Sequence, residues 1–339
     1  MATAATALAL VCGLAATGCD GGRTARGGPG PVGVIVPLLN SPFWRAYNAA
    51  VHQQAKAQKV EALPTVNSLS DREKQISDIH TLIVQGAKGL IIGPVDSAAI
   101  RPGLHAARRE GVPVVAVNDV PESGEVKMVV RADNRAYGQK ACRYLGDSVK
   151  TGKVVQIQGD LASASARDRS EGFSSCMAKN YPGVEVLDLP ALWQSDKAAA
   201  DLDALLSTNP DIKGIYLQAG GVYLAPTLST LRRRDALFPA GSSKHITIVS
   251  NDGVPQELDA IRKGEIDATV SQPVDLYAKY AIFYIKKAMA GQSFKPGPTG
   301  HGSTVVSLPS GLLEDRLPAP IVTKQNVNDK SLWGNRVEG

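Results

Sequence analysis

Polar and aromatic residues stand where the strand-like segments of this 339-residue sequence end. Phe43 and Trp44 follow one apolar run, Asn118 and Asp119 follow a second, and Asp252 follows a third. Hydrogen-bonding side chains beside flat apolar rings suit a small polar ligand that also has apolar faces. The full set of strand-end positions is 40–44 (beginning with Asn40), 93–96, 118–119, 159 onward, Trp193, 218–220, 251–252 and Gln272.

Short runs rich in β-branched residues alternate with longer amphipathic segments from residue 32 onward. In DREKQISDIHTLIVQG, the apolar residues from Ile76 to Ile83 recur at helical spacing, and Gly86 suits the end of a helix. Apolar strands that alternate with helices predict an α/β fold of doubly wound parallel sheets, where ligands bind beyond the carboxyl ends of the strands. The strand candidates are VGVIVPL, KGLIIG, VPVVAV, KVVQIQG, VEVLDL, KGIYLQ, ITIVSN and DATVSQ.

Length and charge narrow the class of protein. The chain has 43% hydrophobic and 20% charged residues, and its length predicts two globular domains. The net charge of +5 is spread thinly, so we expect no nucleic-acid partner, and the arginines at 232–234 are interpreted as a solvated helix end. The five histidines lack metal-ligand spacing, and no phosphate loop or nucleophile elbow follows a strand. We expect no enzyme, no metal and no cofactor.

The first residues predict export. MATAATALALVCGLAATG is uncharged, short and rich in small residues, and it ends directly before Cys19. This pattern resembles a bacterial lipoprotein signal, although it lacks an early Lys or Arg and has Ala16 where Leu is commoner. We expect a signal segment at 1–18, a lipid on Cys19 and a Gly-rich flexible tether at 19–31. The protein would then be anchored on the outer side of the cytoplasmic membrane, or be periplasmic.

Export changes the meaning of the remaining cysteines. Once the signal is removed and Cys19 is modified, Cys142 and Cys176 form an even pair in an oxidising compartment. Two unconnected buried thiols are the alternative.

Six motifs stand in a characteristic order: PLLNSPFW, LIIGPVDSAAI, GVPVVAVND, ADNRAYG, SARDRSEGF and VSNDGVPQELDAIRKGEIDATVSQ. They resemble the type I, ribose-binding-protein-like periplasmic sugar-binding proteins of bacterial ABC importers, over roughly residues 32–323. The resemblance implies a monomer that takes up a monosaccharide or polyol and delivers it to an ABC permease and its ATPase. It also implies two lobes joined by a hinge of three crossovers, with lobes 32–131 plus 273–303 and 132–272 plus 304–323, and a tail at 324–339.

The resemblance also assigns roles in a sugar site. A carboxylate or guanidinium can meet two adjacent hydroxyls at once, and an unpaired buried hydroxyl is costly. Asp252 in NDG matches the carboxylate of the family, and Arg167 in SARDRSEGF matches its guanidinium. Gln272 is expected at the hinge and against hydroxyls. Asn118 and Asp119 take the place of an acidic–basic pair, a departure that puts the hydroxyl pattern of the family in doubt.

The aromatic residues match the walls of the family's cleft. Phe43 and Trp44 would line one wall and Trp193 the other, with the alternative that Phe43 and Trp44 fill the core. Pro37 and Gly93 replace polar residues, and Ala219-Gly220 replaces an Asn-Asp corner. A less polar corner could admit a larger ligand, or one deoxygenated or substituted at that end.

In the family's strand order, the helices that carry Cys142 and Cys176 are neighbours, which favours a disulfide. A second candidate function is a sensor lipoprotein that presents a sugar or a furanosyl signal to a membrane receptor. A neighbouring permease gene would favour import, and a neighbouring histidine kinase gene would favour sensing.

Overall fold

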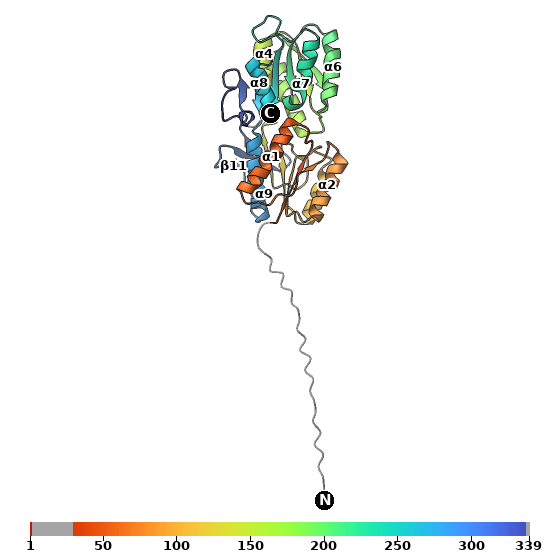
Figure 1. The fold of residues 1–339 in the computed structure, drawn as a ribbon, viewed down its shortest axis with the longest axis vertical. Helices are drawn as coiled ribbons and strands as arrows, with labels where there is room; N and C mark the ends of the chain where they lie inside the picture. The colour runs from red at the N-terminus through yellow and green to blue at the C-terminus, as the bar shows by residue number, and fades with distance from the viewer. Residues whose placement is uncertain (2–29, 337–339) are drawn as a thin grey trace.

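The computed structural model of the chain describes Met1 and residues 30–336. Apart from Met1, the predicted signal segment lies outside the described residues, as do Cys19 and the tether up to residue 29. None of the helices in the described part is long and apolar enough to cross a bilayer. The described chain forms two stacked α/β lobes (Figure 1).

The N-terminal lobe is built on an eight-stranded sheet in the order β11-β12-β13-β5-β4-β3-β1-β2, parallel from β13 to β2. Helices α1 and α9 pack together on one side, and α2 and α3 pack on the other (Figure 1). The strands are β1 (Val32–Val36), β2 (Val66–Asn67), β3 (Gly89–Ile92), β4 (Val114–Val117), β5 (Met128–Ala132), β11 (Gly297–Pro298), β12 (Thr304–Ser307) and β13 (Leu313–Leu317), and the helices are α1 (Pro42–Ala57), α2 (Arg72–Val84), α3 (Arg101–Arg109) and α9 (Val274–Met289).

The C-terminal lobe has a six-stranded sheet in the order β14-β10-β9-β8-β6-β7, parallel except for β14. Helices α4 and α5 pack together on one side, and α6, α7 and α8 lie on the other. The strands are β6 (Gly152–Gln158), β7 (Val184–Pro190), β8 (Ile212–Leu217), β9 (Thr247–Asp252), β10 (Ala268–Ser271) and β14 (Ile321–Thr323), and the helices are α4 (Asn134–Val149), α5 (Ala164–Asn180), α6 (Ser195–Thr208), α7 (Gly220–Arg233) and α8 (Pro255–Lys263).

The chain crosses between the lobes three times. The first crossing lies between β5 and α4, and the second between β10 and α9. The third lies between β13 and β14, at residues 318–320, so the predicted crossing at 304–306 is wrong. Strands β12 and β13 form an antiparallel hairpin that extends the sheet of the N-terminal lobe through Leu317. Residues 304–317 therefore belong to the N-terminal lobe.

The segment after β14 is part of the C-terminal lobe rather than a free tail. Val327, Leu332 and Trp333 are buried, and Trp333 lies in a short 3-10 helix, η1 (Trp333–Asn335). The indole Nε1 of Trp333 donates to the backbone oxygen of Asp252 at 3.2 Å. The predicted tail at 324–339 is therefore corrected up to residue 336, because its apolar side chains complete the packing behind the site.

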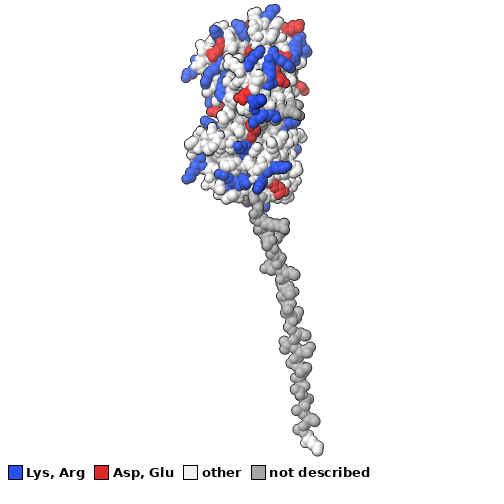
Figure 2. Space-filling model, turned by 60° about the vertical axis from the view of Figure 1, so that its left-hand side comes forward, with Lys and Arg blue, Asp and Glu red and all other residues white. Residues whose placement is uncertain are grey.

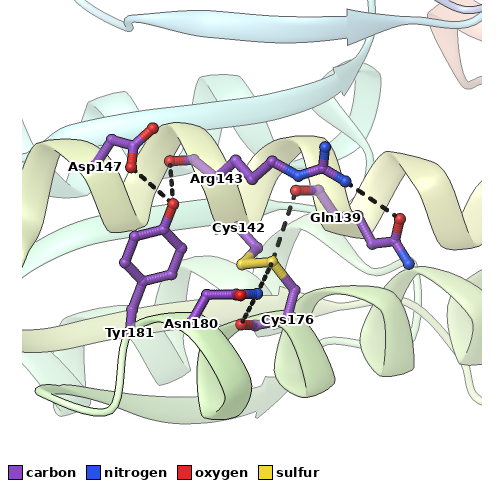
Figure 3. Close-up of a disulfide and its surroundings, with 7 residues drawn as sticks. All are labelled: Gln139, Cys142, Arg143, Asp147, Cys176, Asn180 and Tyr181. Carbon is purple, nitrogen blue, oxygen red and sulfur yellow. Dashed lines mark hydrogen bonds between the residues drawn. A yellow bond between two sulfur atoms is a disulfide. The ribbon is translucent and has the colours of Figure 1, made fainter.

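A disulfide joins Cys142 in α4 to Cys176 in α5, with the two Cα atoms 6.1 Å apart (Figure 3). The two helices cross closely because both carry glycine at the contact. A Cβ atom on Gly138 or on Gly172 would lie 2.2 Å from the backbone of the other helix, which is far inside contact distance. The disulfide therefore links α4 covalently to α5, and α5 carries residues that line the cleft.

Candidate ligand-binding cleft

A cavity of about 210 Å³ lies between the lobes at the carboxyl ends of their parallel strands. Its lining comes from both lobes in roughly equal measure, as expected where ligands bind in open α/β sheets. The lining residues that carry the argument below are Ser41, Phe43, Trp44, Asn118, Asp119, Ser165, Arg169, Trp193, Asp252 and Gln272. Lysines and arginines on the face shown in Figure 2 are scattered over both lobes rather than gathered in one block.

The N-terminal wall of the cleft is aromatic. Phe43 and Trp44 lie in the first turn of α1, with their rings edge to face at 5.2 Å, and only 4% and 9% of each side chain is exposed. Gly93 makes room for this wall, since a Cβ atom there would lie 2.7 Å from the indole of Trp44. Both rings therefore line the cleft and also belong to the core of the lobe.

The sequence predicts Asn40 at the ligand site, and the structure places its neighbour Ser41 there instead. Asn40 is exposed and absent from the cleft lining, and its backbone oxygen accepts a hydrogen bond from Arg45. The next residue, Ser41, occupies the N-cap position of α1 and is buried against the cleft. Ser41 rather than Asn40 therefore presents its side chain at the cleft.

Asn118 and Asp119 follow β4 and are both buried. Asn118 has φ of 66°, a left-handed conformation that asparagine tolerates better than most residues. Its Oδ1 atom is buried and has no hydrogen-bond partner among the described residues, so it is an acceptor that a ligand donor could satisfy. The carboxylate of Asp119 is already engaged: it accepts from the backbone N–H of Ser165 at 2.7 Å and from its hydroxyl at 3.1 Å.

Arg169 is the guanidinium of the cleft. It is 2% exposed, its Nε donates to Oδ1 of Asn134 at 2.7 Å, and Nη1 donates to the backbone oxygen of Gln218. The guanidinium carbon lies 5.5 Å from the ring centre of Tyr137 and 5.9 Å from that of Trp193. The charge is thus fixed by hydrogen bonds and rings of its own lobe before any ligand arrives.

The structure places Arg167, which the sequence predicts as a ligand residue, outside the cleft lining. Its side chain is 38% exposed and donates to Glu122 at 2.9 Å and to the backbone oxygen of Leu161 at 2.8 Å. Two residues along an α-helix turn the side chain by about 200°, so Arg167 and Arg169 point to nearly opposite sides of α5.

Asp252 is the last residue of β9 and lines the cleft, as Arg169 does. Gln272 donates to its Oδ1 at 2.6 Å, and the backbone N–H of Gly221 donates to its Oδ2 at 3.0 Å. Burial raises the pKa of Asp252, and the charge of Arg169 and these two hydrogen bonds partly oppose that rise. Gln272 is itself 2% exposed and stands at the second crossing. The pair can offer both acceptor and donor atoms to hydroxyl groups.

Glu257 lies directly behind Asp252 and was not foreseen from the sequence. It is fully buried in α8 and accepts hydrogen bonds from Ser250, from Thr269 at 2.8 Å and from the backbone N–H of Val254 at 2.9 Å. Burial, with a smaller contribution from the nearby charge of Asp252, raises its pKa to about 8, and the three hydrogen bonds partly oppose the rise. Because like charges repel, the nearby charge of Asp252 favours the protonated form of Glu257.

Trp193 forms the aromatic part of the C-terminal wall. Its indole stacks on Tyr223, with ring centres 6.2 Å apart and planes 11° apart, and the Tyr223 hydroxyl accepts from its backbone N–H at 2.8 Å. A Cβ atom on Gly159 would lie 2.0 Å from this indole, so only glycine fits there. Trp193 is partly exposed. Rings from both lobes therefore face the same cavity.

Two α/β lobes joined by three crossings, with a cleft lined from both sides, define a solute-binding protein. A model of the periplasmic binding protein domain matches residues 32–293, and the chain belongs to this family. Membership confirms the prediction of a two-lobed α/β binding protein rather than an enzyme, and it implies an exported protein.

Similar proteins support this assignment over most of the chain. The chain is 29% identical to the ribose import binding protein of Bacillus subtilis over 251 residues, which is 74% of this chain and 78% of that protein. It is 29% identical to the xylitol-binding protein of Mycolicibacterium smegmatis over 276 residues, 80% and 76% of the two chains. A solved ABC transporter solute-binding protein from Mycobacterium smegmatis with bound glycerol superposes with a TM-score of 0.76 at 27% identity, covering 88% of this chain and 96% of that one.

Proposed function

We propose that this protein binds a monosaccharide or a related polyol in the cleft and delivers it to an ABC permease. The observation that carries the proposal is that buried Arg169 and Asp252 both line a cavity that Trp44 and Trp193 also line. Charged groups held in place meet adjacent hydroxyls without reorganising, and the indoles cover C–H faces. Relatives named for ribose and for xylitol, and a solved one holding glycerol, support this ligand class.

The ligand contacts follow from the geometry. Arg169 donates to hydroxyl oxygens, Asp252 accepts from hydroxyls, and the unpartnered Oδ1 of Asn118 accepts one more. Gln272 and Ser41 complete the polar contacts, while Phe43, Trp44 and Trp193 hold the ring or chain. Because these residues come from both lobes, a ligand that touches them binds the closed form best and shifts the population toward it.

A thermal-shift screen over pentoses, hexoses, polyols and amino acids tests the ligand class. A ligand at 100 times its dissociation constant adds about 2.7 kcal/mol to the free energy of unfolding, which raises the melting temperature measurably. We expect shifts with one or a few sugars or polyols in the wild type, and none in Arg169→Ala. Shifts with amino acids alone would overturn the proposal.

Delivery and anchoring are tested separately. We propose that a lipid on Cys19 holds the protein at the membrane beside its permease, with residues 20–31 as the tether. The protein from a bacterial host should partition into the detergent-rich phase of a Triton X-114 extract, and Cys19→Ser should move it to the aqueous phase without changing ligand binding. With permease and ATPase in nanodiscs, the loaded protein should stimulate ATP hydrolysis more than the empty one. Equal partitioning of the wild type and Cys19→Ser would contradict the lipid anchor. Equal stimulation of ATP hydrolysis by the loaded and the empty protein would contradict delivery to the permease.

A further inference from the structure

The first turn of α5 belongs to the C-terminal lobe but is capped by residues of the N-terminal lobe. The backbone N–H and the hydroxyl of Ser165 both donate to the carboxylate of Asp119, and both residues are buried. The first backbone N–H groups of a helix have no partner within the helix and need one from elsewhere. Here an aspartate from the opposite lobe supplies it.

Ser97 makes a second bridge to the same turn. Its hydroxyl accepts from the backbone N–H of Ala164 at 2.9 Å, and its own backbone N–H donates to the oxygen of Ala162 at 3.1 Å. Ser97 lies between β3 and α3 of the N-terminal lobe and is fully buried. Two consecutive N–H groups of α5 are therefore satisfied across the lobe boundary.

A third bridge is ionic. Arg131, at the end of β5, donates to Asp168 of α5 at 2.8 Å and to Glu314 of β13 at 2.7 Å. Its side chain is 7% exposed and that of Asp168 is 27% exposed. We call the three bridges, made by Ser97, Asp119 and Arg131 to residues 162–168, the interlobe clasp.

We propose that Asp119 is a positioning residue that holds the lobes closed through α5 and thereby sets the place of Arg169, one turn after Ser165. Separating the lobes would expose the engaged carboxylate of Asp119 and leave the N–H groups of Ala164 and Ser165 to water. The clasp therefore contributes stability to the closed form, in addition to what a ligand contributes. The proposal rests on the proposed function only in taking Arg169 as a ligand group.

The test needs no ligand. The full chain carrying Cys19→Ser is stripped of bound solute by unfolding and refolding, and small-angle scattering gives its radius of gyration in plain buffer. Because the clasp adds to the population of the closed form, we expect a larger radius for the Asp119→Ala variant than for this reference protein. Tryptophan emission should shift to longer wavelength in that variant, because Trp44 and Trp193 face the cleft. An unchanged radius and spectrum in Asp119→Ala would overturn the proposal.

Asp71→Ala is the matched control. Asp71 also caps a helix with its carboxylate, accepting from the backbone N–H of Lys74 at 2.8 Å, but both residues lie in the N-terminal lobe. We expect this variant to keep the radius and spectrum of the reference protein, so a change confined to Asp119→Ala cannot be a general loss of capping. If Asp119→Ala fails to fold, Ser97→Ala removes one bridge with a smaller change and should raise the radius in the same direction. Since no sugar enters the measurement, a wrong ligand class leaves the result intact.

Discussion

On the N-terminal side of the cleft, Phe43 and Trp44 present packed rings, whereas on the C-terminal side Arg169 and Asp252 present charges held by hydrogen bonds. The rings are also core residues of their lobe, fixed by packing. The charges are fixed by polar partners within the C-terminal lobe and at its hinge. The two aromatic residues are thus prearranged by apolar packing, and the two charged residues by hydrogen bonding.

The difference assigns separate tasks to the walls. Hydrogen bonds to charged groups are directional and strong, so the C-terminal wall should select which hydroxyl pattern binds. Aromatic packing depends on area more than on pattern, so the N-terminal wall should contribute affinity to any ligand that brings an apolar face. Substitutions on the two walls should therefore differ in what they change.

The largest effect is expected from Arg169→Ala. Loss of a buried, hydrogen-bonded charge that faces the ligand should weaken binding by about 1,000-fold or more, about 4 kcal/mol, as judged by calorimetry with a ligand from the screen. Arg167→Ala, two residues away on the exposed side of α5, is the matched control. It removes a solvent-exposed ion pair with Glu122 of the other lobe, so binding should stay within about threefold of the wild type. If Arg167→Ala weakened binding more than Arg169→Ala did, Arg167 would be the arginine that contacts the ligand.

These two arginines show what the sequence could and could not predict. The motif SARDRSEGF locates the segment, but both arginines fit it. The helical periodicity of this segment distinguishes the two arginines. Arg169 falls on the same face as Gly172, Phe173 and Cys176, all of which are buried. Arg167 falls off that face. Reading the apolar face of the predicted helix before assigning the guanidinium would have selected Arg169.

Other features were beyond sequence reasoning. Glu257 in the first turn of α8 suits the helix dipole, and nothing local indicates that it is buried. Its burial depends on hydroxyls from two neighbouring strands and on the missing side chain of Gly220, whose Cβ atom would lie 2.0 Å from its Oε1. The eight strands read from β-branched runs are all in the fold. The third crossing was misplaced because 304–317, with its central turn, continues one sheet rather than leaving it.

Trp44→Ala and Trp193→Ala compare aromatic residues of the two walls. Trp44 is 9% exposed and part of the core, so its truncation should cost about 3–5 kcal/mol of unfolding free energy as well as affinity. Trp193 is partly exposed and should cost less stability while still weakening binding. Urea denaturation and calorimetry separate the two quantities. Equal stability losses would show that Trp193 is as much a core residue as Trp44.

The disulfide between Cys142 and Cys176 stabilises the C-terminal lobe directly. It closes a loop of 34 residues within the C-terminal lobe, and in the chain-entropy model its loss costs about 3–4 kcal/mol. The double variant Cys142→Ser/Cys176→Ser should melt at a lower temperature, with affinity changed little because neither residue lines the cleft. Alkylation of the exported protein without reductant, followed by intact mass, should find neither thiol free. Two labelled thiols would show that the disulfide between Cys142 and Cys176 does not form.

The smallest effect concerns pH, and it separates stability from binding by sign. Burial raises the pKa values of Asp252 and Glu257, Glu257 from 4.5 to about 8. A carboxyl whose pKa is raised in the folded state contributes stability that is fully present below its unfolded pKa and is lost as pH rises through the folded pKa. The melting temperature of the ligand-free protein should therefore rise as pH falls from 8 toward 5. Affinity should move the other way, because ligand hydroxyls donate to the ionised form of Asp252, which is lost on acidification. Thermal melts with and without the sugar at both pH values give the two trends. Glu257→Gln should flatten the stability trend and leave the affinity trend, whereas parallel trends in the wild type would mean that Asp252 does not accept from the ligand.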